Sequence, residues 1–339
     1  MSQNKFGKKY DRLYVAVVTP YKENYDIDES ALRKLLQYFM QPRFVEAGAG
    51  IIINPAAGEL YYLSREEKRR NVEIAVEECG GKIPIFSGVT DLRTEDAVKV
   101  AVDAKDAGAD GIFLCPPMGL PDITLAWDAN KYPEVWLDMA KAEVKATDLP
   151  AIVHPNAPSS GAFGSGLPLQ ATLKMCREIP NIVGWKMIYS YDSSLLIASA
   201  LRALDRHVAI LAAPAKVFHE NLATGYFDGT VTGAFDYALE PMIDHINAWK
   251  SKDIDKACTI WESGLKDLQY YVYSEFSRLH VKYKAAAWLR ELIPLPFMRP
   301  PGPKPKKEEL FALRELLIKV GLDVIPEKEV NRLIEYFSL

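Results

Sequence analysis

The sequence has little that would tie it to a membrane, to nucleic acid or to an oxidising compartment. No apolar stretch approaches the roughly 18 residues needed to cross a bilayer, and the N-terminal MSQNKFGKKYDR lacks the apolar core of a signal peptide. The 45 acidic and 41 basic residues nearly balance, so no global field attracts nucleic acid or anionic lipid. The four cysteines lie far apart, without a CxxC, and a chain of this size needs no disulfides. We therefore expect a cytoplasmic protein with neither nucleic-acid nor membrane partners.

Common catalytic motifs are also absent. The five histidines form no HxxH or HExxH and none is paired with a cysteine, which disfavours a metal site. No GxSxG marks a serine nucleophile. The segment GAFGSG at residues 161–166 lacks the lysine and the helix that follow a phosphate-binding loop, so it is predicted to be a flexible loop. We expect the protein to work without a metal or another cofactor.

What the sequence does contain is a regular alternation of strand-like and helix-like segments. The helix-like segments include residues 28–40, 64–79, 94–107 and 192–204, and Ser64 with Glu67 forms a capping box at the start of the second. The strand-like segments are short, rich in β-branched residues and almost wholly apolar, as expected of parallel strands that are covered on both faces. They span residues 13–19, 50–54, 83–88, 111–115, 151–154, 182–186, 208–211 and 230–233.

Eight such units in about 250 residues predict an α/β fold, the (β/α)8 TIM barrel. The main alternative, a doubly wound sheet, would carry GxGxxG after its first strand, where this chain reads VTPYKENYD. The strand signals stop near residue 240, and the rest reads as helices interrupted by a proline-rich stretch at 294–305. We therefore predict a catalytic barrel over residues 1–239 and a helical C-terminal extension over residues 240–339. The extension either covers a barrel face or forms an oligomer contact.

The active site of such a barrel lies at the C-terminal ends of its strands. Lys186 ends the sixth strand, where burial in an apolar wall would lower its pKa and leave a neutral amine that attacks ketones. His154 ends the fifth strand and is a candidate for proton transfer. The small-residue turn PAAGE at 55–59 has backbone N–H groups that can hold a carboxylate. From the residues alone, a lysine that extends into solvent and a hydrogen-bonded core histidine remain open alternatives.

Motifs at these strand ends resemble those of the dihydrodipicolinate synthase/N-acetylneuraminate lyase family, class I pyruvate-type aldolases built on a (β/α)8 barrel with a helical extension. NIVGWK at 181–186 is the most specific, because it resembles the family's Schiff-base lysine motif. The resemblance implies that the amine of Lys186 condenses with pyruvate or another 2-oxo acid and that the iminium then acts as an electron sink. It also implies a homotetramer or homodimer. The other similar motifs are VTP at 18–20, GE at 58–59, GADGIFLCPP at 108–117, DGTVTG at 228–233 and FMRPP at 297–301.

Several positions depart from the synthase pattern of that family. Ala56 and Ala57 stand where the GTTGE turn has two hydroxyl residues, and His154 replaces the proton-donating tyrosine of the fifth strand. Met118 replaces a second relay tyrosine, and Ser159 replaces the arginine that binds the carboxylate of the second substrate. By the resemblance, the substrate-binding residues are Ala56, Ala57, Asn156, Ser159, Val231 and Gly233.

These departures argue against synthesis from aspartate semialdehyde. The expected activity is that of a lyase which cleaves a 2-oxo acid, with or without hydration, to pyruvate and an aldehyde, like the family's hydratase-aldolases. We expect His154 to transfer the proton, with Tyr189 and Tyr191 as competing candidates. The apolar segment MGLPDITLAW at 118–127 favours a hydrophobic aldehyde. The alternatives are a 2-keto-3-deoxy sugar acid dehydratase or aldolase, dihydrodipicolinate synthase itself, and, least in keeping with a buried lysine, a non-enzymatic binding homologue.

Overall fold

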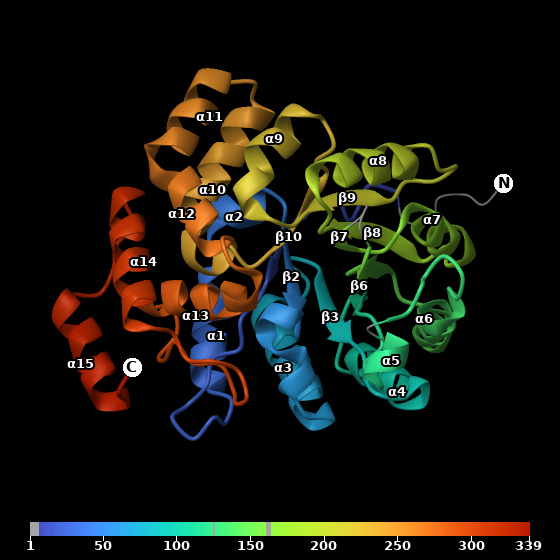
Figure 1. Cartoon of the computed structure of the whole chain (residues 1–339), viewed down its shortest axis with the longest axis horizontal. Helices are drawn as coiled ribbons and strands as arrows, with labels where there is room; N and C mark the ends of the chain where they lie inside the picture. Colours follow the sequence, from blue (N-terminus) through green and yellow to red (C-terminus); the bar gives the residue numbers. More distant parts are fainter. Residues whose placement is uncertain (1–6, 125, 161–163) are drawn as a thin grey trace.

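A closed barrel of eight parallel strands forms the centre of the molecule (Figure 1). The computed structural model describes residues 7–124, 126–160 and 164–339. Around the barrel the strands follow the order β1-β10-β9-β8-β5-β4-β3-β2, so each barrel strand lies beside the barrel strands that precede and follow it in the chain. The predicted (β/α)8 barrel is confirmed, and all eight strand-like segments fall on its strands. These are β1 (Leu13–Ala16), β2 (Ala49–Ile53), β3 (Ile85–Val89), β4 (Gly111–Leu114), β5 (Ala151–Val153), β8 (Ile182–Met187), β9 (Ala209–Ala212) and β10 (Gly229–Thr232).

Helices surround the barrel. The predicted capping box of the helix after β2 is present, because Ser64 Oγ accepts from the Glu67 N–H while the Glu67 carboxylate accepts from the Ser64 N–H. The longer helices next to the barrel are α1 (Glu29–Tyr38), α3 (Arg65–Cys79), α4 (Thr94–Asp106), α6 (Glu134–Thr147), α7 (Leu169–Glu178) and α8 (Tyr191–Arg202). The shorter ones are α2 (Pro42–Glu46), α5 (Pro121–Thr124), α9 (Phe218–Ala223) and the 3-10 turns η1 (Ala56–Gly58), η2 (Leu60–Tyr62) and η3 (Ala215–Val217).

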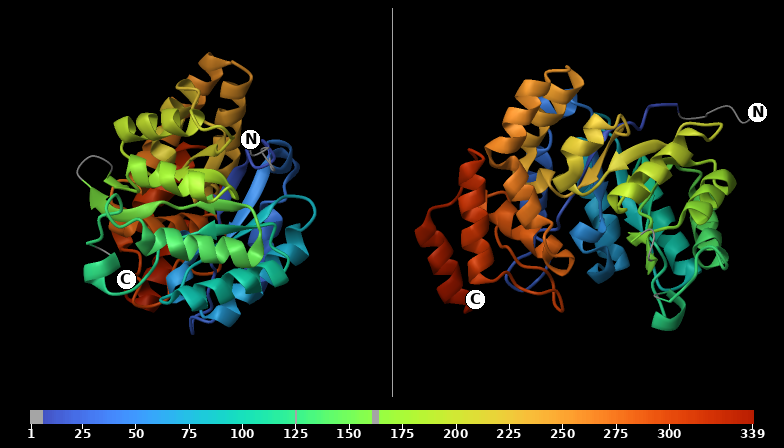
Figure 2. Two further views of the ribbon diagram at one scale, coloured as in Figure 1. Left: turned by 90° about the vertical axis from the view of Figure 1, so that its right-hand side faces the viewer. Right: turned by 45° about the horizontal axis from the view of Figure 1, so that its top comes forward.

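The C-terminal part of the chain is helical, as predicted. Its helices gather on one side of the barrel, away from α4 to α7, in Figure 1 and in the right-hand view of Figure 2. The first of them begins at Phe235, so the proposed domain boundary at residue 239 falls inside a helix and the division stays a prediction. Within the described ranges, no helix is long and apolar enough to cross a bilayer. The helices are α10 (Phe235–Lys250), α11 (Ile254–Ile260), the π-helical turn η4 (Trp261–Leu265), α12 (Lys266–Val272), the 3-10 turn η5 (Phe276–Arg278), α13 (Leu279–Leu289), α14 (Lys307–Lys319) and α15 (Glu327–Phe337).

The barrel strands are apolar on both faces because they separate an inner core from an outer one. In β8, the Trp185 side chain packs in the outer core with residues of α6, α7 and α8. Side chains alternate along a strand, so Gly184 and Lys186 face the interior. A Cβ atom on Gly184 would lie 3.2 Å from Ile152 of β5, a residue of the inner core. The same alternation brings His154, two residues beyond Ile152, into the interior.

A small antiparallel hairpin outside the barrel corrects one prediction. Residues 164–166, expected to belong to a flexible loop, form strand β7 (Gly164–Gly166), which pairs with β6 (Asn156–Ser160). Residues 161–163 of the same predicted loop lie outside the described part of the chain. The ring of Tyr189 packs so closely on Gly166 that a Cβ atom there would be 2.0 Å from it. The glycine therefore serves close packing of the strand, and not loop flexibility.

Candidate active site

Lys186 lies on the interior face of β8, near the C-terminal end of the strand. Its Nζ atom is 5.8 Å from the centre of the Phe113 ring in β4, and among the described residues it forms no ion pair. Burial among the barrel side chains lowers the pKa of Lys186 to about 8, against a smaller opposing effect of Cys115. The residue is nevertheless not completely enclosed. At pH 7 about a tenth of this amine is therefore uncharged and nucleophilic, against less than about 0.1% for an ordinary lysine.

His154 packs against the same aromatic ring as Lys186. The centres of the Phe113 and His154 rings are 5.6 Å apart, so the imidazole and the lysine amine both lie next to Phe113. Burial holds the pKa of His154 well below its usual value of 6.5, and the positive charges of Lys186 and His280 lower it further. Its Nδ1 atom is buried and has no hydrogen-bond partner among the described residues. The imidazole is therefore neutral at physiological pH and one of its nitrogens is free to handle a proton.

His280 of α13 is a third titratable group at this end of the barrel, and it lies outside the sequence motifs of the barrel strands. Burial lowers its pKa to about 4, with further contributions from the charges of Lys186 and Lys284. Like Lys186, it keeps part of its surface accessible. The one signal in the sequence is the spacing of His280 and Lys284, four residues apart and hence on one face of a helix. That signal does not tell which part of the barrel the helix covers.

The turn after β2 leaves two backbone donors unused. In the part of the chain that the structure describes, the N–H groups of Ala56 and Ala57 form no hydrogen bond, whereas those of Gly58 and Glu59 close the 3-10 turn. Thr19 Oγ1 donates to the Gly58 carbonyl at 2.7 Å and holds the turn against the end of β1. Two adjacent free N–H groups at the C-terminal end of a barrel strand form an arrangement that accepts a carboxylate.

Glu59 holds this turn in place from a fully buried position. Its backbone has a φ of 64°, a left-handed conformation that costs energy in a residue with a Cβ atom. The carboxylate accepts a hydrogen bond from Lys284 Nζ at 2.6 Å and another from the Arg299 backbone N–H at 2.7 Å. Neither side chain of the Glu59–Lys284 pair has any exposed surface. The helical extension therefore fixes the turn that presents Ala56 and Ala57.

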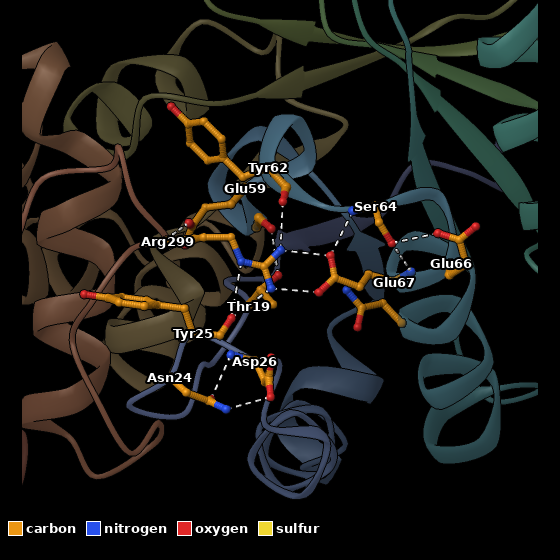
Figure 3. A network of polar contacts seen from close by, with 12 residues as sticks. Thr19, Asn24, Tyr25, Asp26, Glu59, Tyr62, Ser64, Glu66, Glu67 and Arg299 are labelled. Carbon is orange, nitrogen blue, oxygen red and sulfur yellow. Dashed lines mark hydrogen bonds and ion pairs between the residues drawn. The ribbon is translucent and has the colours of Figure 1, made fainter.

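Arg299 joins three segments around the same turn (Figure 3). Its guanidinium donates to the carbonyl oxygens of Tyr25 and Tyr62, each at 2.8 Å. It also makes a bidentate contact with the Glu67 carboxylate, at 2.7 and 2.8 Å. Because Glu67 caps α3 together with Ser64, the arginine connects the loop after β1, the turn after β2 and the start of α3.

The structure places the predicted substrate-binding residues at three strand ends. Val231 is buried in β10, and Gly233 follows that strand directly. The ring of Tyr283 packs on Gly233, where a Cβ atom would be 2.4 Å from it. Asn156 begins β6 and is half-buried. Ser159 lies in the same strand, with its side chain outside the described part of the structure.

Tyr189 and Tyr191, the competing candidates for proton transfer, lie in different environments from that of His154. Tyr189 is buried in the outer core, where its hydroxyl donates to the Leu167 carbonyl at 3.0 Å and accepts from the indole N–H of Trp185 at 2.9 Å. Tyr191 is half exposed at the start of α8. Neither has the enclosed interior position of His154.

The apolar segment 118–127 is divided between the outer core and the surface. Trp127 is buried against residues of α6 and α7, and its indole N–H donates to the Tyr132 carbonyl at 2.6 Å. Leu120 and Ile123 are largely exposed, at 65% and 50% of their surface, and Met118 is half-buried. Leu125 lies outside the described residues. Trp127 thus packs between helices, and the apolar side chains accessible after β4 belong to the residues before it.

One group of possible metal ligands lies at the opposite end of the barrel. Asp11, His207 and Asp228 precede β1, β9 and β10, and their ligand atoms lie within 4.8 Å of one another. His207 Nε2 and Asp11 Oδ1 are 2.6 Å apart. The two oxygens of Asp228 already accept hydrogen bonds from the Arg202 guanidinium and the Ile210 N–H. With a guanidinium on one ligand, this group acts as a polar link between strand starts.

Comparison with known proteins gives a consistent result along nearly the whole chain. The model of the dihydrodipicolinate synthetase family matches residues 9–319. The chain is 28% identical over 324 residues to 4-hydroxy-tetrahydrodipicolinate synthase of Methanopyrus kandleri, covering 95% of this chain and 99% of that one. It is 26% identical to an uncharacterized DapA-like lyase of Thermofilum pendens, over 76% of this chain and 80% of that protein.

Solved structures show the same fold. Dihydrodipicolinate synthase of Aquifex aeolicus superposes with a TM-score of 0.77 at 24% identity, over 93% of this chain and 99% of that one. YagE, a prophage protein of the dihydrodipicolinic acid synthase family from Escherichia coli, was solved in complex with pyruvate. It superposes with a TM-score of 0.78 at 17% identity, over 92% of this chain and 99% of that one. At these identities the likeness concerns the barrel and its helical C-terminal part.

Proposed function

Because this chain belongs to the dihydrodipicolinate synthetase family, we propose that Lys186 forms a Schiff base with pyruvate or another 2-oxo acid. The protein is a lyase of the pyruvate-aldolase type, as its family is. We propose cleavage of a 2-oxo acid to pyruvate and an aldehyde, with or without hydration, as its reaction. The observation that carries this proposal is the position of Lys186 on the interior face of β8, where the residue is not completely enclosed and burial lowers the pKa of its amine to about 8.

The proposed cycle uses the groups around Lys186 in turn. The free N–H groups of Ala56 and Ala57 hold the substrate carboxylate, and the neutral amine attacks the keto carbon. Protonation and loss of water give an iminium, and a substrate with a C3–C4 double bond first adds water to gain a hydroxyl group on C4. The C4 hydroxyl then gives its proton to a base, the electron pair of the C3–C4 bond moves toward the iminium, and an aldehyde leaves. A proton then returns to C3 of the enamine, and water releases pyruvate from the lysine. His154, neutral and with Nδ1 unpaired, carries protons to and from the pyruvate half of the substrate.

Replacing His154 with glutamine should stop turnover and spare imine formation. We expect the rate of pyruvate release to fall by about 10²–10⁴, the usual contribution of a positioned acid–base group. Trapping of the Lys186 imine with cyanoborohydride and pyruvate should continue, because the amine is untouched. The matched control is Tyr189→Phe, which removes the hydroxyl of the competing candidate and should leave turnover within a few-fold. The reverse result, a strong loss in Tyr189→Phe and a mild one in His154→Gln, would transfer the proton-handling role to the tyrosine.

The pH dependence of imine formation should reflect the lowered pKa of Lys186. Only the neutral amine attacks a ketone, so the rate should rise with pH and level off above about 8. With an ordinary lysine, the rate of imine formation would keep rising up to about pH 10.5. The imidazoles of His154 and His280 are already neutral in this range, because burial lowers the pKa of both. They should therefore cause no further rise in the rate between pH 6 and 9. Rapid mixing of enzyme and pyruvate, followed by reductive quenching at each pH, measures this directly. A rate that still climbs through pH 10 would show that Lys186 is not perturbed.

A second candidate function is dihydrodipicolinate synthesis, which the name of the Methanopyrus kandleri relative favours. The Ser159 position argues against it, because losing the arginine that pairs with the carboxylate of aspartate semialdehyde removes a charge-assisted contact. The deciding experiment compares kcat/KM for three substrates. These are aspartate semialdehyde with pyruvate, hydroxybenzylidene-pyruvate, and a 2-keto-3-deoxy sugar acid. We expect cleavage of hydroxybenzylidene-pyruvate to be the most efficient. Efficient synthesis from the semialdehyde would establish the second candidate, and preference for the sugar acid would identify a sugar-acid lyase.

A further inference from the structure

Helix α13 reaches across the C-terminal end of the barrel with one face. Its residues 280, 283, 284 and 287 share that face, because they are spaced by three and four. Tyr283 packs on Gly233, the residue after β10. Lys284 pairs with Glu59, in the turn after β2. Two strand ends of the barrel are therefore contacted by consecutive positions of one helical face.

His280 lies on that face one turn before Tyr283 and Lys284. The centres of the His280 and Tyr283 rings are 5.8 Å apart, so the imidazole stands beside the side chain that covers Gly233. Repulsion by the charge of Lys186 contributes to lowering the pKa of His280, and His280 in turn contributes to lowering the pKa of His154. His280 also keeps accessible surface, which the fully enclosed Lys284 does not. The helical extension thus places an imidazole at the C-terminal end of the barrel, the end at which Lys186 lies.

We propose that His280 is a catalytic residue of this enzyme, which binds the oxygen on C4 of the substrate and takes its proton during cleavage. The proposal rests on the Schiff-base function proposed for Lys186. It assigns the two imidazoles to two halves of the substrate: His154 serves the pyruvate half and His280 the aldehyde half. The substrate class that fits is a 2-oxo acid with a hydroxyl group on C4, in which the aldehyde needs no carboxylate.

The proposed step balances within the site. In the iminium of a 4-hydroxy-2-oxo acid, a neutral nitrogen of His280 accepts the proton of the C4 hydroxyl. The O–H electron pair forms the carbonyl of the departing aldehyde, and the C3–C4 bond breaks. Its pair forms the C2–C3 double bond, while the iminium pair moves to Nζ of Lys186 and gives a neutral enamine. The single positive charge passes from Lys186 to His280, so two charges are never held side by side.

This transfer of charge explains how a buried imidazole can act as the base. Before cleavage, the iminium keeps His280 neutral, because its positive charge disfavours a second one on the imidazole, as the charge of Lys186 does. As electrons reach Nζ, that repulsion disappears and His280 becomes a stronger base at the moment when the proton must leave. By the resemblance, Ser159 stands in the sequence where the synthases have an arginine, so this chain lacks the positive charge that they carry there.

The test separates the two halves of the substrate by two different reactions. The first is exchange of the methyl protons of pyruvate in deuterated water, which needs the Lys186 imine and the pyruvate half alone. The second is cleavage of a 4-hydroxy-2-oxo acid, which is either the sugar acid or the hydrated form of hydroxybenzylidene-pyruvate, whichever the wild type cleaves faster. The variants are His280→Phe, which keeps the ring without its nitrogens, and His280→Gln, which keeps one hydrogen-bond donor. His154→Gln is the matched comparison.

We expect His280→Phe to retain imine trapping and methyl exchange within a few-fold and to lose cleavage by about 10²–10⁴ in kcat. His280→Gln should have a KM close to that of the wild type and a kcat as low as that of His280→Phe, because glutamine can bind the oxygen but cannot accept its proton. His154→Gln should lose the methyl exchange. Cleavage within a few-fold of wild type in His280→Phe would overturn the proposal, and so would an equal loss of exchange and cleavage. If the wild-type enzyme itself traps no imine, the failure lies in the function proposed for Lys186.

Discussion

Replacing Lys186 with methionine should abolish turnover without unfolding the protein. Without the amine there is no iminium to accept the electrons of the breaking bond, so we expect a loss of at least about 10⁴-fold in pyruvate release. Methionine has a similar length and no charge, and the interior position of Lys186 next to Phe113 suits it. The measurement is the cleavage rate of each substrate under saturating conditions. The matched control is Lys174→Met in α7, an exposed lysine that pairs with Glu178 and should leave activity unchanged.

The same variant should be more stable than the wild type at neutral pH. The pKa of Lys186 is lowered in the folded state, so its ammonium form is disfavoured by folding. This cost is fully present below about pH 8, decreases as pH rises, and is absent above about 10.5, where the unfolded chain is also neutral. Denaturant unfolding at pH 7 should therefore show a higher midpoint for Lys186→Met, and the difference should vanish at high pH. Retained activity, or a strong loss of stability at pH 7, would contradict the role given to this lysine.

Of the variants proposed for this protein, those that break the buried Glu59–Lys284 pair should lose the most stability. Both side chains have no exposed surface, and Lys284 Nζ lies 2.6 Å from the carboxylate. The variant Lys284→Met leaves the Glu59 charge buried with only the Arg299 N–H to bind it. We expect a decrease of about 3–5 kcal/mol in the free energy of unfolding, as for other broken buried pairs.

Two further variants decide whether the pairing itself carries this effect. The double variant Glu59→Gln with Lys284→Met removes both charges and should recover most of the loss, because no uncompensated charge remains. Lys266→Met breaks the exposed pair with Glu262 in the helical extension and should cost less than about 1 kcal/mol. Denaturant midpoints of the four proteins provide the comparison. A Lys284→Met variant as stable as Lys266→Met would show that the pair does not hold the turn.

The barrel was predictable because its physical requirements are visible in short stretches of sequence. Strands covered on both faces must be apolar throughout, and the helices between them carry their own caps, such as Ser64 with Glu67. The β6–β7 hairpin lacks both signals. Gly164–Gly166 has almost no side chains to show a period, and its pairing depends on neighbours distant in the chain, among them Tyr189.

The candidate site, too, could be predicted from the sequence only in part. Lys186 and His154 follow from local information, because a residue at the end of a barrel strand lies at the active-site end of the barrel. His280, Lys284 and Arg299 depend on how the extension folds back over the barrel. Lys284 meets Glu59 from 225 positions along the chain, and Arg299 meets it from 240 positions. No spacing within the sequence encodes such a contact.

The most direct test of the account is to identify the lysine that reacts with pyruvate. Among the lysines that the structure describes, Lys186 and Lys284 have a pKa lowered to about 8 by burial, and of these two only Lys186 has accessible surface. The folded enzyme is incubated with pyruvate and borohydride and then digested with a protease. The masses of its peptides are measured by mass spectrometry. We predict one added carboxyethyl group per chain, on the peptide that contains Lys186, and none in Lys186→Met. An unmodified Lys186 peptide in the folded enzyme, or a carboxyethyl group on Lys284, would contradict the account.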